Sequence, residues 1–188
     1  MVEQQMAGEP RTGAWIQTFT GLQFWPMDAR PEEVDIRDIA HSLAMLCRFN
    51  GHCRRFYSVA EHAVHVSRVV APEQARWGLL HDAAEAYLSD LPQPIKRELP
   101  IFRTHEERLL GVIARRFGLA EAMPAAVKQA DMVMLATEKV ALMAKEPVPW
   151  ETLPDPLDPA MIQSWTPEQA ELAFLARFDA LFTPELAR

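Results

Sequence analysis

The chain has 188 residues, of which 49% are hydrophobic, and its formal net charge at pH 7 is −7. This length and composition fit a single globular domain and argue against wholesale disorder, while the acidic balance argues against long nucleic acid as a partner. Two cysteines do not make a disulfide framework. The lack of a leader pattern and of any run of about 18 apolar residues predicts a cytoplasmic protein that does not enter a membrane.

The first 34 residues predict little regular structure. Residues 1–12 are polar and aperiodic, which predicts a flexible tail. Residues 13–34 are rich in aromatic and β-branched side chains around Gly21, which predicts a short β-hairpin or an extended arm. The aromatic side chains of this arm could stack on a nucleobase or pack on the rest of the domain; they belong to Trp15, Phe19, Phe24 and Trp25.

Helical periodicity dominates the rest of the chain. Ser58 and Glu61 have capping-box spacing, so we expect a helix to begin there. Prolines crowd residues 147–165, which predicts a loop, and residues 166–188 predict a last helix that packs on the core. The apolar face of that helix would allow a homo-oligomer. The fold expected is all-α, with about six helices and a possible N-terminal hairpin. Helices are predicted over residues 30–49, 58–70, 72–90, 102–118, 124–146 and 166–182.

Four residues of these helices could form one metal site: His62, His81, Asp82 and Asp131. His81 and Asp82 point about 100° apart on a helix, yet both can reach an ion that lies between them. Helix bundles build metal sites from such inward side chains on facing helices. Two imidazoles and two carboxylates suit Mn, Fe, Co, Ni, Zn or Mg, and such an ion activates water and polarises a phosphoryl oxygen. The alternative is a packed histidine beside a solvated acidic face.

Further polar residues follow on the same helix. Glu85 lies four residues after His81 and three after Asp82, hence on their face, where it could act as a general base or acid. Asp90 lies where the helix should end and could reach a substrate hydroxyl. Lys96 follows a proline turn and is a further candidate for substrate binding.

Residues 47–57 contain several basic side chains and no acidic one. Arg48, Arg54 and Arg55 could bind phosphate through bidentate contacts, or could pair with surface carboxylates. A zinc knuckle is another possibility, although the C-x2-C pair usual in such sites is missing. Its ligands would be Cys47, His52, Cys53 and His62.

The ordered pattern of His62, His81-Asp82 and Asp131 resembles that of HD-domain metal-dependent phosphohydrolases. The flanking stretches "YSVAEHA", "LLHDAAEAYLSDLPQPIK" and "VKQADMVMLATE" are similar to those of bacterial 5'-deoxynucleotidases, over roughly residues 40–145. The N-terminal part, beginning "WIQTFTGLQFWP", is closer to small phage dATP triphosphohydrolases. The resemblance implies that residues 35–146 form an HD-domain core that binds a divalent metal ion.

The resemblance also implies roles for single residues. Glu85 would be catalytic or position water together with the metal ligand Asp82, and Asp90 would contact the sugar. Arg48-Phe49 corresponds to an Arg-Trp pair in which the arginine grips phosphate and the tryptophan helps exclude a ribose 2'-hydroxyl. Because phenylalanine replaces that tryptophan, the preference for deoxyribose stays open.

The expected activity is therefore the removal of phosphate from deoxynucleotides, with Trp15 as part of a wall around the base. Two alternatives remain at this point. One is hydrolysis of a cyclic or polyphosphate signalling nucleotide, and the other is a non-catalytic regulatory domain that binds a nucleotide or a partner protein.

Overall fold

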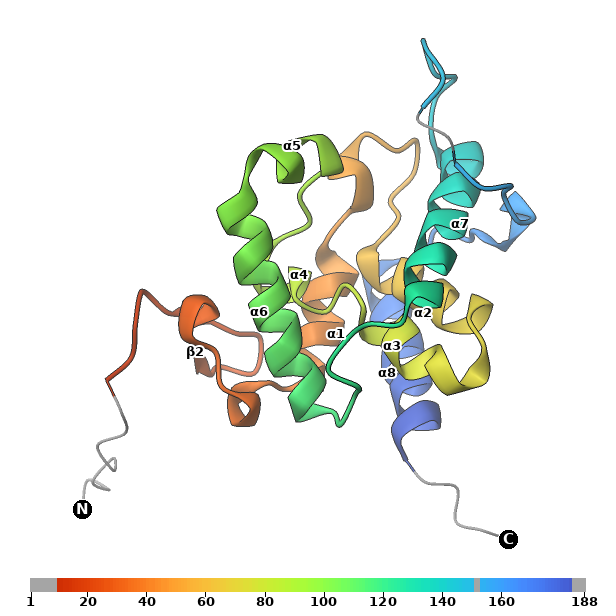
Figure 1. The fold of residues 1–188 in the computed structure, drawn as a ribbon. Helices are drawn as coiled ribbons and strands as arrows, with labels where there is room; N and C mark the ends of the chain where they lie inside the picture. The colour runs from red at the N-terminus through yellow and green to blue at the C-terminus, as the bar shows by residue number, and fades with distance from the viewer. Residues whose placement is uncertain (1–9, 151–152, 184–188) are drawn as a thin grey trace, which may run out of the picture.

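A computed structural model describes residues 10–150 and 153–183, and these form a helical bundle with a small hairpin at its N-terminal edge (Figure 1). The predicted all-α class and the hairpin are confirmed. Most of the tail predicted over residues 1–12, and the end of the helix predicted over 166–188, lie outside the described residues. The helices are α1 (Ile36–Met45), α2 (Val59–Val69), α3 (Ala75–Leu80), α4 (Glu85–Leu88), α5 (Gln93–Glu98), α6 (Pro100–Arg116), α7 (Ala125–Leu142) and α8 (Pro167–Phe182).

The hairpin packs on the bundle through its second strand. β1 (Ile16–Gln17) pairs antiparallel with β2 (Gln23–Phe24) across a turn in which Gly21 has a φ of 86°. The ring of Phe24 is buried and stacks on that of Tyr87 at 4.0 Å, and the buried carboxylate of Asp38 accepts two hydrogen bonds from Thr20. Of the two interpretations of the aromatic arm, packing on the domain therefore accounts for Phe24.

The centre of the bundle is α2, which is flanked by α1, α3, α7 and α8. Every residue from Val59 to Ser67 is buried, because neighbours surround this helix on nearly all sides. Ser58 caps its N-terminus by accepting a hydrogen bond from the backbone N–H of Glu61 at 3.1 Å, as its spacing predicts. The second half of a capping box is replaced by a long-range contact. The Glu61 carboxylate accepts hydrogen bonds from the backbone N–H groups of residues 163–165 at 2.7–3.0 Å.

The predicted helix over residues 72–90 is divided in the structure. A 3-10 turn (Pro72–Gln74) leads into α3, and a tight turn over residues 81–84 separates α3 from α4. Within that turn the N–H groups of Ala83 and Glu85 bond to carbonyls three residues back. No glycine or proline marks this break, so the sequence pattern did not reveal it. The division, together with the separate short helix α5, gives more helices than the six or so expected.

The C-terminal segments cover the bundle. The proline-rich stretch predicted as a loop contains one 3-10 turn (Pro159–Met161), and the N–H of Leu157 donates to the Thr137 hydroxyl of α7. Phe174 of α8 is fully buried, so part of the apolar face considered for a homo-oligomer belongs to the core. None of the described helices is both long and apolar enough to span a bilayer.

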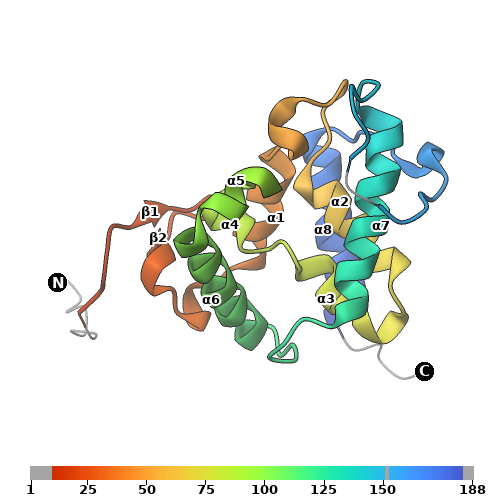
Figure 2. The same cartoon turned by 45° about the horizontal axis from the view of Figure 1, so that its top comes forward.

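Figure 2 shows the hairpin and α6 on one side of the molecule, and α2, α3 and α7 on the other. Helices α1 and α4 lie between these two groups (Figures 1 and 2). The hairpin, whose first strand follows Trp15 directly, is thus separated from α2, α3 and α7.

Gly78 allows α3 to approach α2 closely. A Cβ atom at this position would lie 2.8 Å from the Cα of Ser67 and 3.0 Å from Cγ2 of Val70. We expect Gly78→Ala to lower the free energy of unfolding by about 1–3 kcal/mol, because the two helices must move apart. Urea denaturation of the metal-free protein measures this loss.

Gly111 in α6 supplies the matched control. A Cβ atom there would meet only the flexible end of Arg115, at 3.8 Å. Gly111→Ala should therefore be neutral or stabilise the protein by up to about 1 kcal/mol through the better helix propensity of alanine. If Gly78→Ala were equally harmless, the close approach of α2 and α3 would be refuted.

Candidate metal centre

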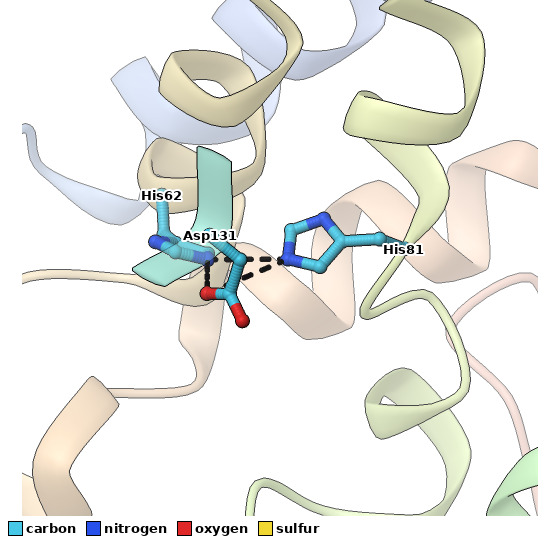
Figure 3. Close-up of side chains that lie close together, drawn as sticks. All are labelled: His62, His81 and Asp131. Carbon is cyan, nitrogen blue, oxygen red and sulfur yellow. Dashed lines mark hydrogen bonds and ion pairs between the residues drawn. The ribbon is translucent and has the colours of Figure 1, made fainter. Parts of the chain in front are cut away.

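The side chains predicted to bind a metal converge on one point. His62 comes from the first turn of α2, His81 from the turn after α3, and Asp131 from α7 (Figure 3). The Nε2 atoms of the two histidines are 3.2 Å apart, and Oδ1 of Asp131 lies 3.2 Å and 4.0 Å from them. Oδ2 of Asp82 lies 3.6 Å from Nε2 of His62 and 3.2 Å from that of His81. Donors about 2.1 Å from one ion lie roughly 3.0–4.2 Å apart, so the spacing of His62, His81 and Asp131 fits a single divalent cation, with Asp82 beside them.

Burial differs between the two kinds of ligand. The side chains of His62 and His81 are 0% and 4% exposed, whereas those of Asp82 and Asp131 are 21% and 34% exposed. The imidazoles therefore form the floor of the centre and the carboxylates form its open side. Solvent or a substrate can reach a bound ion from that side.

The outer ring nitrogens of both histidines are held by buried acceptors. Nδ1 of His81 donates to the carbonyl of Gly78 at 2.9 Å, and Nδ1 of His62 donates to Oε1 of Glu138 at 2.5 Å. A carboxylate and a carbonyl can only accept, so in each neutral ring the proton lies on Nδ1 and the lone pair on Nε2. Such partners of ligand histidines fix the ring and raise its basicity. The two Nε2 atoms are thus prepared to bind a cation.

Glu138 is the residue of this centre that the sequence analysis missed. It is fully buried, and its carboxylate also accepts hydrogen bonds from the Tyr57 hydroxyl at 2.9 Å and from Nε of Arg48 at 3.1 Å. It lies seven residues after Asp131, two turns along the same face of α7. That spacing, with an acidic residue inside an apolar helix, is the signal that could have identified it.

The carboxylates of the centre control the charge of the histidines. Burial and Arg48 lower the pKa of His62, but Glu138 and Asp131 raise it by more. Burial raises the pKa of Asp82, and the adjacent His81 lowers it well below its usual value. The same competition, with His62 as the main opposing group, lowers the pKa of Asp131. The carboxylates of the centre therefore favour the protonated form of both imidazoles when no cation is bound.

Of the three arginines predicted to bind phosphate, the structure brings Arg48 to the centre. Its Nη1 atom lies 3.6 Å from Oδ2 of Asp82, in addition to the contact of its Nε with Glu138. Arg54 and Arg55 are exposed on the following loop. Phe49 is half-buried, with its ring centre 5.6 Å from the Arg48 guanidinium and 6.5 Å from the ring of Trp150.

The backbone after Arg48 is strained. The 3-10 turn Arg48–Gly51 contains Phe49 with a φ of 56° and Asn50 with a φ of 51°, both in the left-handed region. Each such residue costs about 1–3 kcal/mol and persists where its surroundings enforce it, often at functional sites. The buried ion pair of Arg48 with Glu138 is one such enforcing contact.

The zinc knuckle considered from the sequence does not assemble. Both ring nitrogens of His62 face other partners, Glu138 on one side and the metal centre on the other. Cys47 and Cys53 do lie together, with their Sγ atoms 3.6 Å apart. His52 is exposed.

Glu85 and Lys96 form a second buried pair beside the centre. Nζ of Lys96 donates to Oε1 of Glu85 at 3.0 Å and to Oε1 of Glu106 at 2.7 Å. Lys96, a predicted substrate-binding residue, thus lies between two carboxylates. Oε2 of Glu85 is buried and has no hydrogen-bond partner within the part of the chain that the structure describes.

The pKa values of this second group follow from its burial. Burial, Asp82 and Asp90 raise the pKa of Glu85 well above its usual value, and Lys96 opposes them. Asp90 is half-buried after α4, and burial raises its pKa while Arg48 lowers it. Asp90 is close enough to Arg48 and Asp82 for both charges to affect its pKa.

We expect Glu138→Gln to weaken metal binding about 10- to 100-fold, because the amide cannot hold the His62 ring as the carboxylate does. Equilibrium dialysis with metal analysis measures the loss. The control is Tyr57→Phe, which removes one donor to the same carboxylate and leaves its bond to His62 in place. Equal affinities for both variants would show that Glu138 does not orient His62.

Metal binding should also depend on pH. Burial lowers the pKa of His81, but Asp82 and Asp131 outweigh it and raise the pKa from 6.5 to about 9. At neutral pH an incoming ion must therefore displace a proton, so the apparent affinity for Mn²⁺ should rise with pH towards about 9. Titration calorimetry in two buffers with different ionisation heats measures the released protons. His52→Ala, which alters an exposed histidine, should leave the pH dependence unchanged. Constant affinity between pH 6.5 and 9 would contradict the assignment.

Comparison with known proteins supplies relatives without a described activity. No family model matches the chain. It is 46% identical over 126 residues to the "Uncharacterized protein YfdR" of Escherichia coli K12, an alignment that covers 67% of this chain and 71% of YfdR. It is 30% identical over 187 residues to the "Uncharacterized protein RCAP_rcc00048" of Rhodobacter capsulatus, covering 89% of this chain and 95% of that protein. Similarity of this extent shows that the chain belongs to one protein family with YfdR and RCAP_rcc00048.

Proposed function

We propose that this protein is an HD-type metal-dependent phosphohydrolase that removes phosphate from deoxynucleotides. The observation that carries the proposal is the convergence of His62, His81, Asp82 and Asp131 beside the buried Arg48. When bound there, a divalent ion polarises a phosphoryl oxygen and lowers the pKa of a water molecule. The cytoplasm, where nucleotides are abundant, is the location that this function favours.

The position of Arg48 favours a substrate that carries a phosphate group. Its guanidinium has five N–H donors, and the contacts with Glu138 and Asp82 involve Nε and Nη1. The remaining donors can bind phosphate oxygens on the open side of the centre. Because Glu138 and Asp82 hold the Arg48 guanidinium, its remaining donors are positioned before a substrate binds.

The properties of Glu85 favour an enzyme over a domain that only binds a nucleotide. It lies on α4, directly after the turn that carries two of the metal ligands, and its pKa is raised by burial and by Asp82. A carboxyl group with a raised pKa can hold or transfer a proton near neutral pH. In our proposal it handles the proton of the attacking water or of the leaving oxygen, and Lys96 holds it in place.

Asp90 and Phe49 are the candidates for recognition of the nucleoside. Asp90 is half-buried after the end of α4 and can accept a hydrogen bond from a sugar hydroxyl. Phe49 adjoins Arg48, so a nucleotide whose phosphate contacts Arg48 would extend along its ring. Trp15, on the arm that precedes β1, has no place in this proposal.

Phosphate release with separation of the products tests the function. Protein loaded with Mn²⁺, Co²⁺ or Zn²⁺ is incubated with dAMP, AMP, dATP and dGTP. We expect Asp82→Asn to lose bound metal and turnover together, because it removes a ligand charge. Glu85→Gln should keep the metal while kcat falls by about 10²- to 10⁴-fold, because it removes the carboxyl group that transfers the proton without removing a metal ligand.

The products separate the possible outcomes. Inorganic phosphate from dAMP indicates a nucleotidase, and tripolyphosphate from dATP indicates a triphosphohydrolase. If the protein hydrolysed only a cyclic nucleotide or a guanosine polyphosphate, its substrate would be a signalling nucleotide and not a deoxynucleotide. Metal-loaded protein that cleaves none of these compounds would refute the enzyme and favour a regulatory domain.

A further inference from the structure

Cys47 and Cys53 flank the loop that carries Arg48. Their Sγ atoms are 3.6 Å apart, both residues are free thiols, and both are partly exposed. A disulfide has an S–S distance of about 2.05 Å, so the sulfurs need to approach by only about 1.6 Å. Burial and the neighbouring Cys47 raise the pKa of the Cys53 thiol, which favours its protonated form at rest.

The two ends of this loop are anchored differently. Cys47 forms an isolated β-bridge with Ser58, and the flanking Arg48 N–H donates to the Tyr57 carbonyl at 2.9 Å. Cys53 is held less directly, through the bond of the Arg54 N–H with the Leu142 carbonyl and a long contact of its own Sγ with the Arg48 carbonyl at 3.9 Å. When the two sulfurs approach, the loop up to Cys53 therefore moves more than the β-bridge between Cys47 and Ser58.

We propose that Cys47 and Cys53 are a modification site, oxidised by a peroxide to an intramolecular disulfide that closes the loop around Arg48. With hydrogen peroxide, one thiol loses its proton and the thiolate attacks a peroxide oxygen. The O–O bond breaks, a sulfenic acid forms, and the departing hydroxide takes up that proton to become water. The second thiol then attacks the sulfenic sulfur, the S–S bond forms, and a second water leaves. Two thiols thus lose two protons and two electrons, and one peroxide becomes two waters.

The disulfide would act on phosphate binding through Arg48. The loop from Cys47 to Cys53 contains Arg48 and three successive residues with positive φ, Phe49, Asn50 and Gly51. A shift of this loop alters the 3.1 Å and 3.6 Å contacts that orient the guanidinium. The metal ligands lie on α2, α7 and the turn after α3, outside the closed loop. This consequence rests on the proposed function, whereas formation of the disulfide does not.

Peptide mapping tests the modification itself. Reduced, metal-loaded protein is treated with hydrogen peroxide, alkylated with N-ethylmaleimide and digested with trypsin. Trypsin cleaves after Arg48, so Cys47 and Cys53 fall in different peptides unless a disulfide joins them. We expect the joined peptides in treated wild type, their loss after dithiothreitol, and their absence in Cys53→Ser. Alkylation of both cysteines after the treatment, or separate sulfinic acids, would overturn the proposal.

Kinetics test the link to Arg48. Oxidation should raise KM for the hydrolysed nucleotide several-fold, leave kcat and bound metal unchanged, and be reversed by dithiothreitol. Cys47→Ser and Cys53→Ser should resemble the reduced wild type with or without peroxide. A disulfide that forms without changing KM would refute the link to Arg48. Failure of the proposed function is separable, because it abolishes turnover in the reduced protein and leaves the peptide map intact.

Discussion

The geometry of the candidate metal centre depends on one buried carboxylate, that of Glu138. Glu138 has no exposed surface and accepts hydrogen bonds from an imidazole, a guanidinium and a phenol. A charge in such a position is tolerated only when it is paired and fully hydrogen-bonded. Its three donors come from α2, from the turn that begins at Arg48 and from the segment before α2. One group therefore fixes the relative positions of the elements that surround the metal centre.

This dependence has an energetic side. A buried ion pair is not in itself strong stabilisation, because the loss of hydration offsets the attraction between the charges. Here the ion pair fixes geometry. The Glu138 carboxylate holds the proton of His62 on Nδ1, and it orients the Arg48 guanidinium. It also holds Arg48, the residue directly before the left-handed backbone at Phe49 and Asn50. Stability and pre-organisation of the site are thus coupled in a single residue.

Sequence patterns predicted the all-α class because helical spacing is a local property. The four proposed ligands were candidates by residue type, and it was the resemblance of their order and flanking stretches to a known family that joined them into one site. His62 and Asp131 stood out as titratable residues within apolar helices. The interruption after α3 was not visible, since it arises from a change in backbone hydrogen bonding without glycine or proline. The pairing of Lys96 with Glu85 and Glu106 was also missed, because it depends on how α4, α5 and α6 meet in space.

The attachment of residues 163–165 to Glu61 bears on how this family can diverge. The contact is made by three backbone N–H groups. It therefore depends on the backbone conformation of residues 163–165 and not on a side-chain donor. The three bonds do not depend on which side chains stand at positions 163 and 164, whereas the Trp165 ring also stacks on His65. Position 164 is the restricted one, since its φ of 58° favours residues that tolerate the left-handed region, such as glycine or asparagine. The end of the link before α8 is thus fixed by backbone bonds to one carboxylate, by the buried Ile162 and by one conformationally constrained residue.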